Sequence, residues 1–112
     1  MFGPAFRLLS EAGIPPYLDG FCYFKEAIDL VSKDPDRINH ITKEIYPEIG
    51  RRHGVSGSCV ERSMRNALAV AWRETYSAKS IFLWEKLHFT KEKRPSNSEF
   101  LSAVSDYLDL ES

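Results

Sequence analysis

Arginine and asparagine side chains recur along residues 58–73 at intervals that would present them to the edges of DNA bases. At about 100° per residue, one side of a helix over this segment carries Ser58, Arg62, Asn66, Ala69 and Arg73. Arg65 and Glu61 flank that side. Arginine pairs bidentately with guanine and asparagine with adenine, so this face predicts a base-reading surface. The alternative interpretation is an ordinary solvated face of a core helix, which is the commoner role of polar faces.

The opposite side of the same segment is apolar. Its members recur three or four positions apart, and they are Val60, Met64, Ala67, Leu68, Ala71 and Trp72. Such a stripe predicts an amphipathic helix that is buried along one face. We expect this helix to open at Ser58, whose hydroxyl would cap the first turn with Glu61 as its capping-box partner.

A second helix precedes this one across a very short break. It ends in Arg51, Arg52 and His53, and the break at residues 54–57 reads Gly-Val-Ser-Gly. Two helices joined so closely form a helix-turn-helix unit, here over about residues 41–73, whose second helix can lie in a DNA major groove. We expect Arg51 and Arg52 to contact DNA phosphates, and a role as cations that complement the helix dipole is compatible with this.

The net charge of the chain is −1, which at first argues against a nucleic-acid partner. The distribution of charge matters more than the total. Residues 51–73 hold five arginines against one glutamate, a local charge of +4, whereas residues 1–36 hold three basic and six acidic residues, a local charge of −3. The positive field therefore lies where the helix pair would meet DNA.

The rest of the chain also follows helical spacing and has no strand-like alternation, so we predict an all-α fold with six helices, the fourth being the recognition helix. Helices are expected within residues 1–13 and 21–32. Between 36 and 53 the sequence allows either one helix kinked at Pro47 or a new helix starting there. Tyr76, Ile81, Phe82, Leu83, Trp84, Leu87 and Phe89 predict a fifth helix packed on the core, and Ser96 or Ser98 is expected to cap the last one.

Several classes of protein are disfavoured. No apolar run is long enough to cross a membrane, no signal peptide is evident, and Cys22 and Cys59 form no disulfide framework, so we expect a reduced cytoplasmic protein. The three histidines lack metal-ligand spacing to one another or to the cysteines. No nucleophile motif occurs either. We expect no enzyme activity, no catalytic residues, no cofactor and no metal.

Several short motifs occur together in one order. They are Ile41-Thr42-Lys43, Tyr46-Pro47, Val60-Glu61-Arg62, Ala71-Trp72 and Asn97-Ser98-Glu99-Phe100. With these motifs, nearly the whole chain resembles the DNA-binding effector domain of the stage-zero sporulation response regulator of endospore-forming bacteria. The resemblance implies a six-helix fold, transcriptional control through boxes of the GTCGAA type, and copies that bind double-stranded DNA side by side as a dimer.

The resemblance also implies which residues contact the bases. In that family an Arg-Val-Glu-Arg run and an arginine three residues later do so, and these carry over to Glu61, Arg62 and Arg65. Asn66 stands where the family has histidine, and we add it to the base-contacting set. Cys59 replaces the first arginine of the run. Losing an arginine–guanine pair costs roughly 1–3 kcal/mol of discrimination, so an altered or relaxed target sequence is expected.

Further residues and partners complete this prediction. DNA backbone contacts are expected from Ser58, Arg51, Arg52, Arg73, Lys91, Lys93 and Arg94. Residues 73–87, where the family contacts RNA polymerase, match poorly, so contact with polymerase does not follow from the resemblance. The polymerase sigma subunit and a full-length regulator are the two candidate protein partners. The chain shows no βα alternation that would indicate the family's phosphate-receiving domain. An excised domain and a naturally short protein are both compatible with this.

Two hypotheses follow. The first is a sequence-specific DNA-binding transcriptional regulator. The second is a protein-interaction module that keeps the fold, has lost productive DNA reading and modulates a full-length regulator. The cluster of arginines on one helix face favours the first, and Cys59 with the divergent fifth helix motivates the second.

Overall fold

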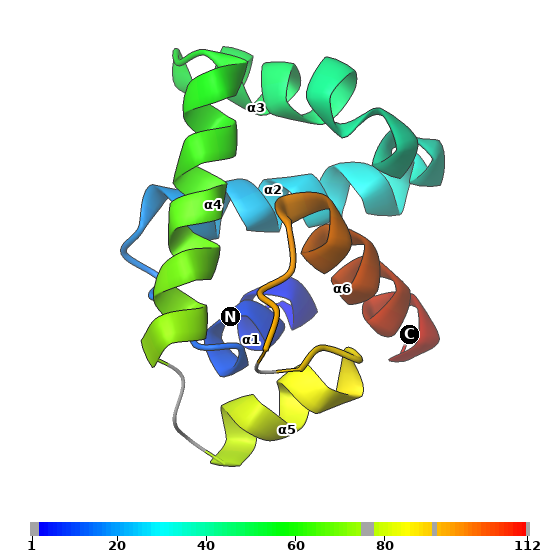
Figure 1. The fold of residues 1–112 in the computed structure, drawn as a ribbon. Coiled ribbons are helices and arrows are strands. Elements are labelled where there is room, and N and C mark those ends of the chain that lie inside the picture. The colour runs from blue at the N-terminus through cyan, green and yellow to red at the C-terminus, as the bar shows by residue number, and fades with distance from the viewer. Residues whose placement is uncertain (1–2, 75–77, 91, 112) are drawn as a thin grey trace.

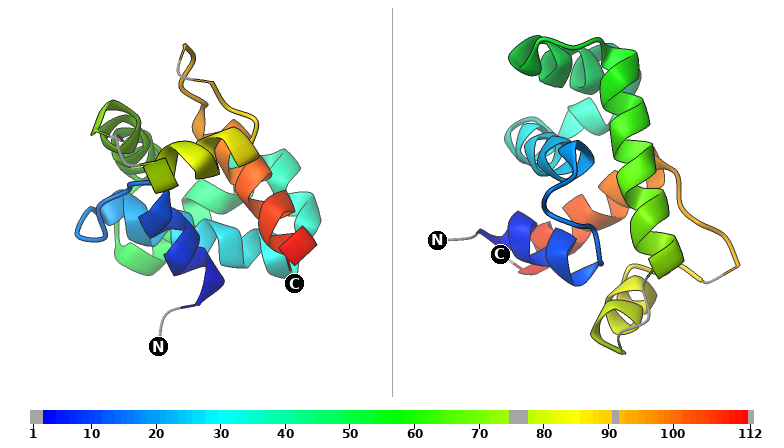
Figure 2. Two further views of the ribbon diagram at one scale, coloured as in Figure 1. Left: turned by 90° about the horizontal axis from the view of Figure 1, so that it is seen from below. Right: turned by 90° about the vertical axis from the view of Figure 1, so that its left-hand side faces the viewer.

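The computed structural model describes residues 3–74, 78–90 and 92–111, which form helices joined by short connections (Figures 1 and 2). The α-helices are α1 (Pro4–Glu11), α2 (Asp19–Lys33), α3 (Tyr46–His53), α4 (Gly57–Glu74), α5 (Ala78–Lys86) and α6 (Asn97–Glu111). A 3-10 helix, η1 (Pro35–His40), and a π-helix, η2 (Ile41–Ile45), link α2 to α3. No strand occurs within these described ranges, and the predicted all-α, six-helix fold is confirmed.

Helix α2 passes behind α4 in Figure 1, and these two helices share the most extensive contact between helices among the described residues. Gly20, in the first turn of α2, lies so close to α4 that a Cβ atom there would be 2.3 Å from the carbonyl oxygen of Ser63. Beside this contact, Phe24 of α2 packs in one core with Met64 and Leu68 of α4, and all three are fully buried. The apolar stripe predicted for the recognition helix is therefore the face of α4 that packs on the core.

The chain between η1 and α4 resolves the alternatives left open at Pro47. The N–H of Tyr46 donates to the carbonyl of Ile41, five residues earlier, and α3 begins at Tyr46 with Pro47 in its first turn. Proline has no N–H to donate, which costs nothing in a first turn because those N–H groups have no intrahelical partner. The α-helix therefore starts at Tyr46 with Pro47 in its first turn, but it continues directly from η2, because Ile45 is itself right-handed helical (φ −76°, ψ −56°). A single helix over residues 36–53 does not form, since η1 is a 3-10 helix and the backbone leaves the helical conformation at His40 (φ −134°, ψ 39°).

The start of α6 is held by its own cap and by a buried amide. The Ser96 hydroxyl accepts from the N–H of Glu99 at 3.1 Å, and the Glu99 carboxylate accepts from the N–H of Ser96 at 3.0 Å, which is a reciprocal capping box. The first of the two predicted capping serines is thus the one used. The buried Asn97 side chain donates to the Tyr46 hydroxyl at 3.2 Å and to the Glu61 carbonyl at 3.1 Å. Through Asn97, α6 is bonded to both α3 and α4.

Helix α5 packs on the core through Trp84. Its indole N–H donates to the carbonyl of Ala12, after the end of α1, at 3.1 Å. Its ring lies 5.2 Å from that of Trp72 and 5.2 Å from that of Phe100, measured between centroids. Such edge-on and tilted arrangements of aromatic rings are favourable. The predicted docking of a fifth helix on the core is confirmed by these contacts.

One residue of that helix was predicted wrongly. Phe82 is 59% exposed, and the Lys86 ammonium lies 4.8 Å from the centre of its ring. Phe82 is two positions from Trp84, so when Trp84 faces the core, a helix turns Phe82 away from it. Tyr76, which was also expected to pack there, lies outside the described residues. No helix in the described part of the chain is both long and apolar enough to span a membrane.

We expect Gly20→Ala to lower the free energy of unfolding by about 1–3 kcal/mol, the usual cost of overpacking a core contact. The new methyl group would meet the Ser63 carbonyl and the Ala67 side chain, both on α4. Urea denaturation followed by far-UV circular dichroism measures the change. Gly3→Ala is the matched control because a Cβ atom at Gly3 meets nothing within 4 Å. Equal stability of the two variants would contradict the close crossing.

Candidate nucleic-acid interface

The turn between α3 and α4 depends on a glycine in the left-handed conformation. Gly54 ends α3 with φ +70° and ψ 30°, and its N–H donates to the carbonyl of Gly50. The N–H of Val55 donates to the same carbonyl at 2.9 Å. A helix that ends on a left-handed glycine can change direction within a few residues. The tight connection expected of a helix-turn-helix unit is therefore present between Tyr46 and Glu74.

The cap of α4 differs from the predicted one. The hydroxyl of Ser56 accepts from the N–H of Cys59 at 3.0 Å, and α4 begins at Gly57. The prediction that Ser58 caps the helix with Glu61 as its partner is wrong, because Ser56 occupies the cap position and its hydroxyl reaches the third amide of the helix. Ser58 instead lies in the first turn, with its side chain exposed.

The outward face of α4 carries Arg62 and Asn66 into solvent. Both side chains are exposed, whereas Val60, Met64 and Leu68 on the other face are buried. Within the residues that the structure describes, neither Arg62 nor Asn66 makes an ion pair or a side-chain hydrogen bond. Figure 2 (right) shows α4 lying along one side of the molecule, next to the turn. The polar groups that the sequence predicted for base contact are thus available to an external partner.

Arg65 and Glu61 pair with each other on the surface of α4. The Arg65 Nε lies 3.0 Å from Glu61 Oε2, and the two side chains are 59% and 35% exposed. An exposed ion pair between residues four apart on a helix contributes only about 0.3–0.5 kcal/mol. Such a pair opens at little cost. Both residues lie close to Arg62 on the helix. Because their ion pair is weak, either side chain could leave it to contact an external partner such as a base edge.

The arginines that end α3 have partners inside the molecule. Glu48 accepts from Arg51 Nη2 at 2.6 Å and from Arg52 Nε at 2.9 Å, and Arg52 Nη1 also lies 3.3 Å from Glu26 Oε1 on α2. Hydrogen bonds from the two guanidinium groups lower the pKa of Glu48 to about 2. Arg51 stays 72% exposed but Arg52 only 36%. Arg52 thus bridges two carboxylates and helps to hold α3 on α2, a structural role that the sequence did not reveal.

The other predicted phosphate contacts lie farther from the turn. Arg73, Lys93 and Arg94 are exposed, whereas Lys91 lies outside the described residues. At 1.5 Å per residue, Arg73 is about 16 Å along the axis of α4 from Arg62, which is more than the width of one major groove. Arg73 therefore lies well away from the part of α4 that carries Arg62. Lys93 and Arg94 belong to the connection that returns from α5 to the start of α6 (Figure 1).

A comparison with known protein families identifies the domain. Residues 5–108 match the family described as "Sporulation initiation factor Spo0A C terminal". The chain belongs to this family. The family consists of DNA-binding regulatory domains of sporulation factors rather than of enzymes, so the exposed face of α4 lies on a DNA-binding domain of the sporulation type. The resemblance noted from the short sequence motifs is confirmed.

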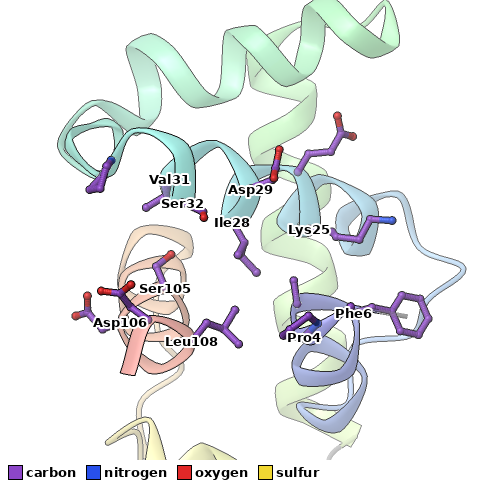
Figure 3. Close-up of a pocket in the computed structure, with 15 residues that line it drawn as sticks. Pro4, Phe6, Lys25, Ile28, Asp29, Val31, Ser32, Ser105, Asp106 and Leu108 are labelled. Atoms are coloured by element: carbon purple, nitrogen blue, oxygen red, sulfur yellow. The ribbon is translucent and has the colours of Figure 1, made fainter. Parts of the chain in front are cut away.

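This Spo0A-type domain also has a groove away from α4. Figure 3 shows Pro4 and Phe6 of α1, Ile28 of α2 and Leu108 of α6 around it. The groove has a volume of about 640 Å³, and none of the residues that line it belongs to α3 or α4. It therefore takes no part in the helix-turn-helix surface.

We expect Ser56→Ala to lower the free energy of unfolding by about 1 kcal/mol, the usual cost of losing a helix cap. Ser58→Ala, two residues later, should change it by less than about 0.5 kcal/mol because the Ser58 side chain is exposed and takes no part in the cap. Chemical denaturation of both variants beside the wild type measures the difference. A larger loss in Ser58→Ala than in Ser56→Ala would show that the capping assignment is wrong.

Proposed function

We propose that this domain is a sequence-specific transcriptional regulator that reads the major groove of double-stranded DNA with the first half of α4. The observation that carries the proposal is the Arg62 guanidinium, which is exposed next to the turn and has no internal partner among the described residues. When DNA covers this face, the guanidinium loses its water, and leaving it without a partner would cost free energy. A guanine edge compensates for this loss, because it supplies two acceptors in the geometry that arginine prefers.

The neighbouring side chains have complementary roles in this proposal. Arg65 and Glu61 exchange their mutual ion pair for base edges, and Asn66 pairs with adenine. Ser58 in the first turn of α4 contacts a phosphate, which the positive end of the helix dipole also attracts. Arg51, Arg73, Lys93 and Arg94 are exposed and contact phosphates farther along the duplex. Arg52 reaches a phosphate only by giving up one of its two carboxylates.

Copies of the domain bind side by side on DNA in this proposal, as the family resemblance implies. Two adjacent copies double the number of base contacts, and each copy raises the effective concentration of the other at the neighbouring site. The RNA polymerase sigma subunit and a full-length regulator are proposed as protein partners. The exposed Phe82 ring on α5, over which the Lys86 ammonium lies, offers an apolar contact on a different helix from the two that form the helix-turn-helix unit.

We expect Arg62→Ala to lower the preference for a GTCGAA-type box over scrambled duplex by about 1–3 kcal/mol, or roughly 5- to 140-fold. The loss follows because the bidentate contact to guanine disappears while the phosphate contacts stay. Fluorescence anisotropy with both duplexes, at two salt concentrations, measures the ratio of affinities.

Two other variants control this measurement. Arg7→Ala removes an exposed arginine from α1 and should leave the ratio unchanged. Arg94→Ala should weaken binding to both duplexes alike and reduce the slope of affinity against salt by about one unit. Wild-type affinity for the box that is no better than for scrambled duplex at either salt concentration would refute sequence-specific reading.

We expect Cys59→Arg to strengthen binding to the GTCGAA-type box by about 1–3 kcal/mol, because it supplies the arginine that the family has at this position. The Cys59 side chain is partly exposed in the first turn of α4, close to Arg62 in the helix, so the longer side chain can extend toward the groove. Selection from a random duplex pool, carried out with both proteins, measures the change in preferred sequence. Identical selected sequences would show that position 59 does not face the bases.

The alternative is a protein-interaction module without productive DNA reading. Cys59 at the family's arginine position and the exposed Phe82 favour it. Under this alternative the domain co-purifies with the full-length regulator in the presence of nuclease, Phe82→Ala weakens that association, and Arg62→Ala leaves it unchanged. Under the first proposal Arg62→Ala changes DNA selectivity instead, so the same two variants separate the functions.

A further inference from the structure

Three side chains that commonly bind metals meet where α3 ends against α2. The sulfur of Cys22, a carboxylate oxygen of Glu26 and a ring nitrogen of His53 all lie within 4.8 Å of one another. Cys22 and Glu26 are one turn apart on α2, and His53 is the last residue of α3. Glu26 and His53 are 27 positions apart in the chain, so no short sequence spacing revealed the group.

The three groups converge on a single oxygen atom. The Cys22 thiol donates to Glu26 Oε2 at 3.4 Å, and His53 Nε2 contacts the same oxygen. The ring of Tyr23 lies edge-on to the imidazole with 5.0 Å between centroids, which restricts its orientation. Cys22 and Glu26 are half-buried while His53 is more exposed, so an ion could enter from solvent and would then be partly shielded from it.

This combination of ligands suits zinc. Thiolate, imidazole and carboxylate bind Zn²⁺ at about 2.3, 2.0–2.1 and 2.0–2.2 Å, so ligand atoms around a tetrahedral ion are about 3.3–3.8 Å apart. The present separations of at most 4.8 Å need side-chain shifts on the order of 1 Å to reach that geometry. A thiolate ligand disfavours magnesium and calcium. We propose that Cys22, Glu26 and His53 bind one Zn²⁺ ion, with water as the fourth ligand.

The neighbouring Arg52 guanidinium opposes metal binding by its positive charge. Arg52 Nη1 lies 3.3 Å from Glu26, but it pairs with Oε1, whereas Oε2 faces Cys22 and His53. The guanidinium is also shared with Glu48, which offsets part of its charge. Burial and the adjacent Glu26 raise the pKa of the Cys22 thiol, which also works against metal binding, because zinc must displace the thiol proton to solvent. The arrangement tolerates Arg52 because the two cations use different oxygen atoms.

Zinc at this position would join two elements that the helix-turn-helix unit needs in a fixed relation. His53 immediately precedes Gly54, where the chain turns toward α4. A bond network from α2 through the ion to His53 would hold the end of α3 in place. Because the ion binds the folded arrangement and not the unfolded chain, it should raise the stability of the domain. This inference does not depend on which DNA sequence the domain reads.

The experiment is a titration of the reduced domain with Co²⁺ and then with Zn²⁺. We expect one ion per chain, visible absorption typical of tetrahedral cobalt, a near-ultraviolet band from thiolate-to-cobalt charge transfer, and bleaching of both by zinc. Cys22→Ser should abolish the charge-transfer band. Residues that only contact a metal's ligands already change metal affinity about 10- to 100-fold. Removing a direct ligand by His53→Gln should therefore weaken cobalt binding by at least about tenfold. Zinc should raise the melting temperature of the wild type more than that of either variant at the same zinc concentration.

Matched controls use the other cysteine and another exposed histidine. Cys59→Ser and His40→Gln should bind cobalt and respond to zinc as the wild type does, because neither residue belongs to the group. Far-UV circular dichroism of every variant shows whether it is folded before metal is added. Absence of the charge-transfer band in the wild type, its dependence on Cys59, or an unchanged zinc response in Cys22→Ser would each overturn the proposal. The contacts would then be an ion-pair network only.

Discussion

The close crossing of α2 and α4 is the constraint on which the rest of this domain depends. The absence of a side chain at Gly20 lets the backbone of α2 approach the Ser63 carbonyl of α4, and Phe24 and Met64 pack in the core beside it. Since α4 is amphipathic, seating its apolar stripe on the core turns Arg62 to solvent. The same packing therefore stabilises the fold and exposes the face that would meet DNA.

The charged groups near the turn serve two different purposes. Arg52 and His53 pair with Glu26, and Arg51 and Arg52 share Glu48, so most of the positive charge at the end of α3 is compensated within the molecule. Arg62 has no such partner among the described residues. Arg62 is therefore an exposed cation close to the turn, although the net charge of the whole chain is −1.

Errors in the sequence-based prediction arose where two nearby residues satisfy the same rule. Ser56 and Ser58 both precede the apolar stripe, and only the backbone angles decide which hydroxyl reaches the Cys59 amide. Phe82 and Trp84 are both large and aromatic, but a helix can turn only one of them to the core. The sequence left two alternatives open at Pro47 because proline occurs both at kinks inside helices and in the first turn of a helix. Only the backbone hydrogen bonds distinguish the two cases.

By itself the sequence determined the helical class, the two faces of α4 and the family, because helical periodicity and short motifs are properties of neighbouring residues. Only the tertiary structure decided that Arg52 bridges Glu26 and Glu48, and that Cys22, Glu26 and His53 meet. These contacts join α2 to α3, and their partners are set by how the helices pack across the core. Local spacing carries no information about that packing, since residues far apart in the chain are brought together only when the fold is complete.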